Sequence, residues 1–169
     1  MSKITWIIPV FFIFSCSTTE VQEQVYSGEA LGTTYQIKFF HTEEVAMEKG
    51  LDSIFGLMNA SMSTYQADSF ISRINAGDTS VIVDENFREV FELSDKVYEE
   101  SEGYFDPTVG KIVNIFGFGP ELGDESIEQI EIDSLMRYVG FNKINLTPNN
   151  RVEKEYRDLF IDVKDIAKG

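Results

Sequence analysis

Four short stretches of the sequence place turn-forming residues beside polar side chains that could contact a ligand. They are ALGTTY (30–35), MSTYQADS (62–69), YFDPTVGKIVNIFGFG (104–119) and IDVKDIAKG (161–169). Taken singly, each has an ordinary structural explanation as a turn former, a helix cap or the end of a strand. Together they offer the hydroxyl, carboxylate and ammonium groups of a polar binding site.

Several familiar catalytic signatures are missing from the sequence. It contains no G-x-S-x-G elbow, no GxxxxGK[ST] phosphate loop, no cysteine pair and no histidine cluster. The single histidine, His41, lies between a predicted strand and a predicted helix, and we expect it on the surface. A metal site built on His41 would lack partner ligands.

The periodicity of apolar residues predicts the elements that must position these stretches. Alternation at Tyr35, Ile37 and Phe39 predicts a strand that pairs with Val25–Ala30 across a turn at 31–33. Mixed helices and antiparallel strands predict an α+β fold, with a mixed or antiparallel sheet and packed helices. The other predicted elements are helices at about 47–58, 84–101 and 126–139, a short helix ending near 75–77 and a strand at 143–146. A polar turn at 147–150 leads to further strand-like residues, of which Leu159–Val163 are the most apolar.

Composition limits the class of protein and its partners. A length of 169 residues with 43% hydrophobic residues indicates one globular domain, with or without a tail. The net charge is −15, from 29 acidic and 14 basic residues, which argues against nucleic acid as a partner. The acidic stretch at 121–133 is typical of a solvated face rather than of a metal site.

The N-terminus resembles a bacterial lipoprotein signal. A lysine at position 3 precedes an apolar run from Ile4 to Phe14, which is shorter than the roughly 20 residues that a membrane-spanning helix needs. Ile13-Phe14-Ser15-Cys16 is similar to a lipobox, and Cys16 is the only cysteine. We therefore expect a signal peptide at 1–15, lipidation at Cys16 and a flexible tether at 16–24.

A lipid on Cys16 would place the protein in the bacterial cell envelope, anchored to a membrane on its periplasmic side. Two alternatives remain open for this segment. It could be an ordinary signal peptide in which the cysteine occurs by chance, or a short anchor helix.

In this order, the four stretches resemble the signatures of the ApbE family of FAD:protein FMN transferases. Residues 31–33 are similar to the family's MGT strand, 62–75 to its mStY…dSeisrlN signature, and 105–119 to its fDpTvgplvnlWgFg signature. Residues 139–141 and 161–169 correspond to its vGy and iDlggiAKGya elements. The resemblance implies an ApbE-like, T-fold-like architecture for residues 25–169.

The resemblance also implies an activity. Members of the family use Mg²⁺ and move FMN from FAD to a threonine hydroxyl of an exported acceptor protein, with release of AMP. Phosphoryl transfer depends on charge neutralisation and positioning more than on covalent catalysis. Lysine suits a phosphate, aromatic rings stack on flavin or adenine, and carboxylates suit Mg²⁺.

Carried over position by position, the resemblance implies roles for individual residues. Asp106 and Lys168 are the candidate catalytic residues, and Asp165 falls where the family offers a metal-coordinating oxygen. Thr108 and Asn114 either contact the nucleotide or hold the turn. The implied flavin-nucleotide contacts are Leu31, Tyr65, Tyr104, Phe105, Asp106, Asp162 and Lys168.

The sequence departs from the family pattern in two ways that matter. Lys164-Asp165 replaces a pair of small residues, so that Asp165 either adds a carboxylate ligand to the metal or crowds its site. Family members continue beyond the AKG motif with further metal and nucleotide contacts, whereas Gly169 is the last residue here. We therefore expect the N-terminal half of such a domain.

Two alternative functions remain open at this point. An enzyme with the same pocket could use water in place of the threonine and split FAD into FMN and AMP. The chain could also be an inactive, flavin-binding lipoprotein if the C-terminal half is absent.

Overall fold

The computed structural model describes residues 20–31, 33–116 and 129–167. Both strand pairs are antiparallel, and helices lie between them in the chain, so the predicted α+β class is confirmed. The elements, in chain order, are β1 (Gln22–Ala30), β2 (Thr33–His41), α1 (Glu48–Met62), α2 (Phe70–Asn75), α3 (Glu85–Glu100), α4 (Gly110–Ile115), α5 (Gln129–Leu135), the 3₁₀ turns η1 (Met136–Tyr138) and η2 (Phe141–Lys143), β3 (Ile144–Leu146), β4 (Val152–Lys154) and α6 (Lys164–Ala167).

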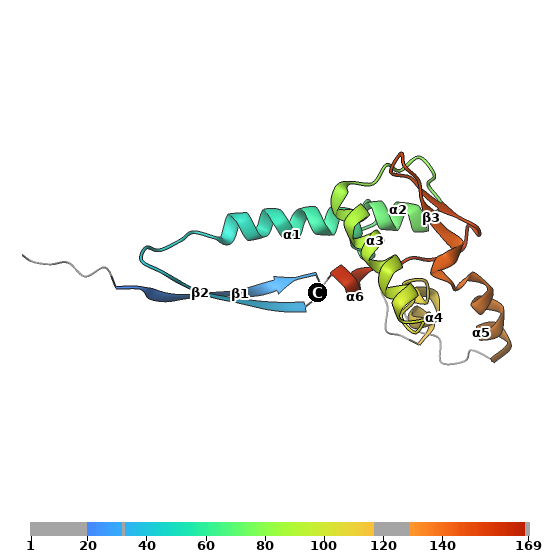
Figure 1. The fold of residues 1–169 in the computed structure, drawn as a ribbon, viewed down its shortest axis with the longest axis horizontal. Coiled ribbons are helices and arrows are strands. Elements are labelled where there is room, and N and C mark those ends of the chain that lie inside the picture. Colours follow the sequence, from blue (N-terminus) through green and yellow to red (C-terminus); the bar gives the residue numbers. More distant parts are fainter. Residues whose placement is uncertain (1–19, 32, 117–128, 168–169) are drawn as a thin grey trace, which may run out of the picture.

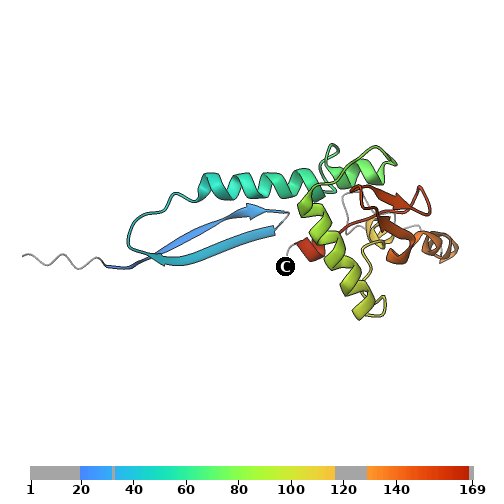
Figure 2. The same ribbon diagram turned by 45° about the horizontal axis from the view of Figure 1, so that its top comes forward.

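The molecule is elongated, with a projecting layer and a compact body (Figures 1 and 2). In the projecting layer α1 runs alongside the β1–β2 hairpin, and the tip of the hairpin points toward the body. In the body, α2 and α3 pack against the β3–β4 pair and against the segment 159–163. Because the hairpin tip points inward, residues of the first predicted stretch lie beside the body.

The hairpin confirms the pairing predicted from the sequence. Gln22 lies opposite His41 and Ala30 lies opposite Thr33, so the ladder covers both strands completely. The strand β1 begins earlier than expected, and residues 22–24 of the expected tether are therefore paired with β2.

Packing between the hairpin and α1 rests on aromatic side chains. The Tyr35 ring lies 5.0 Å from the Phe55 ring of α1, measured between ring centroids. The Tyr26 hydroxyl donates to the Val45 carbonyl oxygen and so ties β1 to the chain that leads into α1. Every described residue of the hairpin nevertheless stays at least partly exposed.

Side-chain caps fix the ends of the helices that carry the predicted motifs. The Asp84 carboxylate accepts from the Phe87 backbone N–H at 2.8 Å and caps the N-terminus of α3. The same oxygen accepts from the Ser61 hydroxyl at 2.9 Å, which joins the end of α1 to the start of α3. The Ser69 hydroxyl oxygen caps α2 by accepting from the Ser72 N–H at 3.1 Å.

The core of the body is built around three aromatic rings. Phe91 packs against Phe87 at 6.3 Å and against Phe141 at 4.8 Å, measured between ring centroids. Burial of such side chains is the main favourable contribution to folding. The buried apolar residues of this core are Met62, Ile71, Ile74, Val81, Val83, Phe87, Phe91, Phe141, Ile144, Val152, Leu159, Ile161 and Val163.

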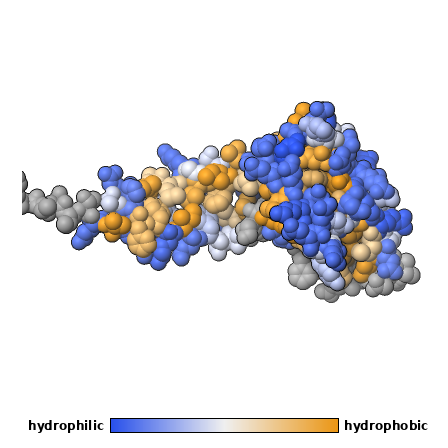
Figure 3. Space-filling model, in the orientation of Figure 1, coloured by the Kyte–Doolittle hydropathy of each residue, from blue (hydrophilic) through white to orange (hydrophobic). Residues whose placement is uncertain are grey.

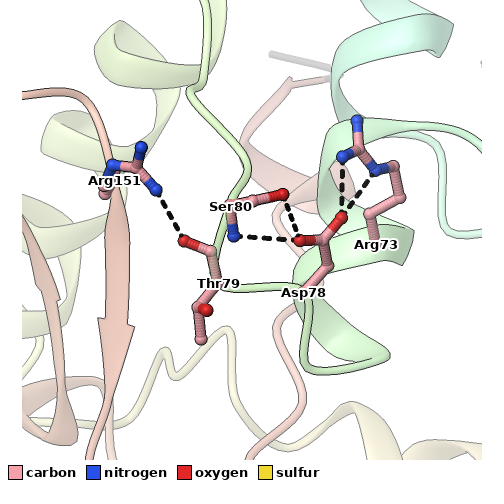
Figure 4. Close-up of polar contacts among 5 residues, drawn as sticks. All are labelled: Arg73, Asp78, Thr79, Ser80 and Arg151. Carbon is pink, nitrogen blue, oxygen red and sulfur yellow. Dashed lines mark hydrogen bonds and ion pairs between the residues drawn. The ribbon is translucent and has the colours of Figure 1, made fainter.

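Polar contacts hold the loop that joins α2 to α3 (Figure 4). Arg73 pairs with Asp78 at 2.7 Å, and the Ser80 hydroxyl donates to the other oxygen of Asp78 at 2.6 Å. Arg151 donates to the Thr79 carbonyl oxygen at 2.8 Å from the end of the β3–β4 turn. The Ser80 and Arg73 hydrogen bonds lower the pKa of Asp78 to about 2.

The prediction of strand-like residues after the 147–150 turn is confirmed by β4 but is wrong for Leu159–Val163, the most apolar of them. Leu159–Val163 forms no regular secondary structure and is paired with no strand among the described residues. Its polar groups bond elsewhere, since the Ile161 N–H donates to the Asn75 side chain and the Asp162 N–H donates to the Pro107 carbonyl oxygen. The strand that follows the 147–150 turn is β4.

The remaining expectations agree with the structure over the described residues. The helix predicted at 126–139 corresponds to α5 and η1 from residue 129 onward, and 126–128 lie outside the described residues. The apolar run that follows Asp106 forms the short helix α4. Within 20–31, 33–116 and 129–167, no helix is long and apolar enough to cross a bilayer.

Candidate functional site

The predicted site centres on the turn formed by 105–110. One Asp106 carboxylate oxygen accepts from the Thr108 backbone N–H at 2.8 Å and from the Thr108 hydroxyl at 2.6 Å. The buried Thr108 hydroxyl oxygen in turn accepts from the Gly140 N–H at 2.6 Å. Thr108 therefore holds the turn and links it to the 139–141 motif, so Asp106 also has a structural role.

This turn is joined to the second acidic motif by backbone contact. The Asp162 N–H donates to the Pro107 carbonyl oxygen at 2.8 Å. Gly110 allows the close approach, because a Cβ atom there would lie 2.5 Å from the Phe160 ring and 3.6 Å from the Asp162 Cβ. The structure thus brings the 105–110 and 161–165 stretches together.

Two side chains outside the predicted site fix the course of 157–162. The Asn75 amide donates to the Ile161 carbonyl oxygen and accepts from the Ile161 N–H, both at 2.9 Å. The Lys154 ammonium donates to the carbonyl oxygens of Ile74, Arg157 and Leu159, each at 2.9 Å. Burial, with the charge of Lys111 as a second cause, lowers the pKa of Lys154 to about 8.

The 62–69 motif places the aromatic ring of Tyr65 near the 161–165 stretch. The Ser63 carbonyl oxygen accepts from the Ser69 hydroxyl at 2.6 Å and from the Ser72 hydroxyl at 3.1 Å, so the start of α2 holds this turn. Tyr65 is 64% exposed, as a stacking surface for a ligand would be. The Thr64 hydroxyl is a buried polar group with no hydrogen-bond partner in the part of the chain that the structure describes.

Lys164 connects this ring to the second acidic motif. Its ammonium lies 2.8 Å from an Asp162 carboxylate oxygen and 5.6 Å from the centroid of the Tyr65 ring. Burial opposes the charged form of Lys164, but the hydrogen bond and charge of Asp162 outweigh it and raise the pKa of Lys164.

The hairpin tip carries the first of the predicted site residues, Leu31. Leu31 has a positive φ of 54° in the turn between β1 and β2. With Thr33 and Asn59 it lines an open hollow of about 630 Å³, a volume within the range of ligand pockets. Asn59 lies in the last turn of α1, from which the chain leads to Tyr65. In both ribbon views α6 lies beside this tip (Figures 1 and 2).

The remaining predicted site residues differ in their exposure and local contacts, and two of them lie outside the described residues. Tyr104 is 97% exposed, so the structure does not bring its ring against the other site residues. Phe105 is half-buried, and its N–H donates to the Ser101 hydroxyl oxygen at 3.0 Å. Asn114 is buried within α4. Lys168 and Cys16 lie outside the described residues, so their predicted roles stay predictions.

The described residues offer few side-chain donors to a metal ion. Among the described residues, no three His, Cys, Asp or Glu side chains gather in a metal-binding group. Asp162 is paired with Lys164, Asp106 is bonded to Thr108, and Asp165 is exposed. Mg²⁺ commonly takes one or two carboxylates together with substrate phosphate and water, so an exposed Asp165 fits the ion as a single ligand.

The sequence and the fold both match known proteins. The ApbE family model matches residues 31–169, and this chain belongs to the ApbE family. The FAD:protein FMN transferase of Haemophilus influenzae is 32% identical over 98% of this chain and 52% of its own length. The corresponding protein of Vibrio cholerae is 33% identical over 87% of this chain and 46% of its own length.

The solved structures agree with this assignment. A mutant of the flavin transferase ApbE from Vibrio cholerae superposes with a TM-score of 0.80 at 29% identity, over 87% of this chain and 52% of that one. The ApbE-like architecture expected from the sequence is therefore confirmed. The chain spans about half the length of the curated relatives it matches.

Sequence reasoning missed the residues that hold the site in place. Asn75 ended a quoted motif but had no assigned role, and Lys154 was not singled out. Lys164 was noted only as a departure from the family pattern. The positions of these three residues in the sequence do not indicate their roles, because each residue bonds to backbone groups or side chains that only the fold brings near.

Proposed function

We propose that this chain belongs to a Mg²⁺-dependent FAD:protein FMN transferase. The observation that carries the proposal is the junction of the predicted motifs, in which Pro107 bonds to Asp162 and Lys164 reaches both Asp162 and Tyr65. Membership of the ApbE family supports a flavin nucleotide as the ligand of this junction.

In the proposed reaction the hydroxyl oxygen of an acceptor threonine attacks the phosphorus on the FMN side of the FAD pyrophosphate. The bond to the bridging oxygen breaks, AMP leaves, and the hydroxyl proton passes to a base or to solvent. The Tyr65 ring would stack on a flavin or adenine ring, and Asp106, Asp162 and Lys168 would contact the nucleotide. Asp165 would hold the Mg²⁺, which supplies charge neutralisation at the phosphates.

Incubation of the protein with FAD, Mg²⁺ and an exported protein that carries the target threonine tests the proposal. We expect the acceptor to gain the mass of FMN and an equal amount of AMP to appear. An acceptor with valine in place of the threonine is the control. Release of FMN and AMP without a mass gain would instead identify a pyrophosphatase, and retention of FAD without AMP would identify a binding protein.

We also propose that Cys16 carries a lipid that anchors the protein in the bacterial cell envelope on the periplasmic side. The single cysteine and the apolar run before it support this proposal. In a bacterial host, the Cys16→Ser variant is expected to lose the lipid mass and to leave the membrane fraction. Unchanged mass and membrane association in that variant would contradict the proposal.

A further inference from the structure

Lys164 is in an unusual position for a basic residue of this acidic chain. Its side chain is only 25% exposed, and its ammonium lies between Asp162, at 2.8 Å, and the face of the Tyr65 ring, at 5.6 Å. These two partners come from different segments of the chain. Within the described residues, no other salt bridge or cation–π contact reaches a predicted site residue.

The charges around the site favour a lysine ammonium there in addition to the proposed Mg²⁺. Its described carboxylates, at Asp106, Asp162 and Asp165, would repel the two negative charges of a dinucleotide pyrophosphate. A lysine ammonium is a compact charge on a flexible stem with three donors, so it can keep one contact to a carboxylate while it donates to a phosphate. The ion pair with Asp162 holds this ammonium at the site.

We infer that Lys164 is a phosphate-binding residue of this site and that it selects phosphorylated flavins over riboflavin. The inference rests on the proposed function and deepens it, because it assigns the pyrophosphate contact to a position where the family resemblance indicates a small residue. Tyr65 provides the ring contact that phosphorylated and unphosphorylated flavins share, and Lys164 provides the contact that requires phosphate.

Two variants separate charge from size at this position. Lys164→Gln removes the charge but keeps a polar side chain of similar reach, and Lys164→Arg keeps the charge. Lys96→Gln is the matched control, because Lys96 is an exposed lysine of α3 that pairs with Glu100 at 3.8 Å, outside the predicted site. Thermal unfolding of each variant checks that the fold is retained.

Equilibrium binding of FAD, FMN and riboflavin to the full chain, followed by flavin fluorescence, tests the inference. For Lys164→Gln we expect FAD and FMN to bind roughly 10- to 100-fold more weakly, as for loss of a charge-assisted hydrogen bond, and riboflavin to bind within about twofold of the parent. Lys164→Arg, which keeps a charged phosphate donor, and Lys96→Gln should bind all three flavins within about threefold of the parent.

Other outcomes would overturn the inference in distinguishable ways. An equal loss for riboflavin and FAD would mean that Lys164 only positions Tyr65 or Asp162. Unchanged binding of FAD by Lys164→Gln would remove Lys164 from the site while leaving the proposed function intact. Failure of the parent protein to bind FAD would overturn the proposed function and this inference with it.

Discussion

The backbone N–H of Asp162 donates a hydrogen bond to the carbonyl oxygen of Pro107, and the two atoms are 2.8 Å apart. This bond joins two stretches that are more than fifty residues apart in the sequence and that both carry predicted nucleotide contacts. The geometry of this hydrogen bond depends on the residues next to its two ends. These are Thr108, which follows Pro107 in the turn, and Ile161, which precedes Asp162.

Asn75 is expected to be a positioning residue for the site. The Asn75→Ala variant loses both hydrogen bonds to the Ile161 backbone, which should lower the free energy of unfolding by about 1–3 kcal/mol. It should also weaken FAD binding, because Asp162 follows Ile161 directly. Urea unfolding and FAD titration measure the two effects. Asn145→Ala, at an exposed position of β3, is the control and should change neither.

Thr108 is expected to stabilise the turn through its hydroxyl. Thr108→Val leaves the Gly140 N–H without its acceptor and removes one of the two hydrogen bonds that Asp106 accepts, at a cost of about 1–3 kcal/mol. Thr108→Ser keeps the hydroxyl and should retain most of the stability. Equal destabilisation by both variants would show that the methyl group, and not the hydroxyl, matters.

Asp106 has both a structural and a predicted binding role, and two substitutions separate them. Asp106→Asn keeps an oxygen that can accept from Thr108 but removes the charge, so it should preserve stability while changing FAD binding. Asp106→Ala should reduce both. Chemical denaturation combined with FAD titration makes the comparison, and normal FAD binding by Asp106→Asn would contradict a role for its charge.

Two glycines on helices should respond oppositely to alanine. At Gly110 an added Cβ would lie 2.5 Å from the Phe160 ring, so Gly110→Ala should destabilise by about 1–3 kcal/mol. Gly56, inside α1, has no neighbouring atom within 4 Å of an added Cβ. Gly56→Ala should therefore stabilise by about 0.5–1 kcal/mol through helix propensity. Thermal unfolding of both variants tests the contrast.

Asp78 should contribute a pH-dependent part of the stability. Its pKa falls from 3.8 to about 2 on folding, because of hydrogen bonds from Ser80 and Arg73 (Figure 4). The folded state thus binds fewer protons at this group between these two values, so its contribution is complete above pH 4 and is lost as the pH falls toward 2. The difference in unfolding free energy between the parent and Asp78→Asn should shrink over that interval. A difference that is constant with pH would contradict this assignment.

The local pattern of the sequence predicted the helices and strands better than it predicted the contacts between distant segments. Alternation at Tyr35, Ile37 and Phe39 was sufficient for the hairpin, because side chains in a strand repeat every two residues. The same argument failed at Leu159–Val163, which is apolar because it is buried, not because it pairs with a strand. The bonds from Asn75 and Pro107 that satisfy this segment come from residues distant in the sequence, and no local pattern encodes them.

At the candidate site, too, the sequence identified residues but not the contacts that connect them. Motif resemblance indicated Asp106, Asp162 and Tyr65, and the structure links them through Pro107 and Lys164. It did not indicate that Asp106 already accepts two hydrogen bonds from Thr108. Tyr104 was predicted on equal grounds with Tyr65, yet its ring lies in solvent.

The shallow burial of the β1–β2 hairpin has a consequence for the timing of events at the site. Its residues are all exposed or only partly buried, and the apolar side chains of Phe40 in β2 and Leu57 in α1 are exposed. Figure 3 shows hydrophobic surface on the projecting layer. Segments with few buried contacts open at lower free energy than a packed core, so backbone amides of β2 should exchange with deuterium sooner than those of α3. Leu31 at the hairpin tip therefore belongs to a fast-opening unit, whereas Asp106 and Asp162 belong to a slow one.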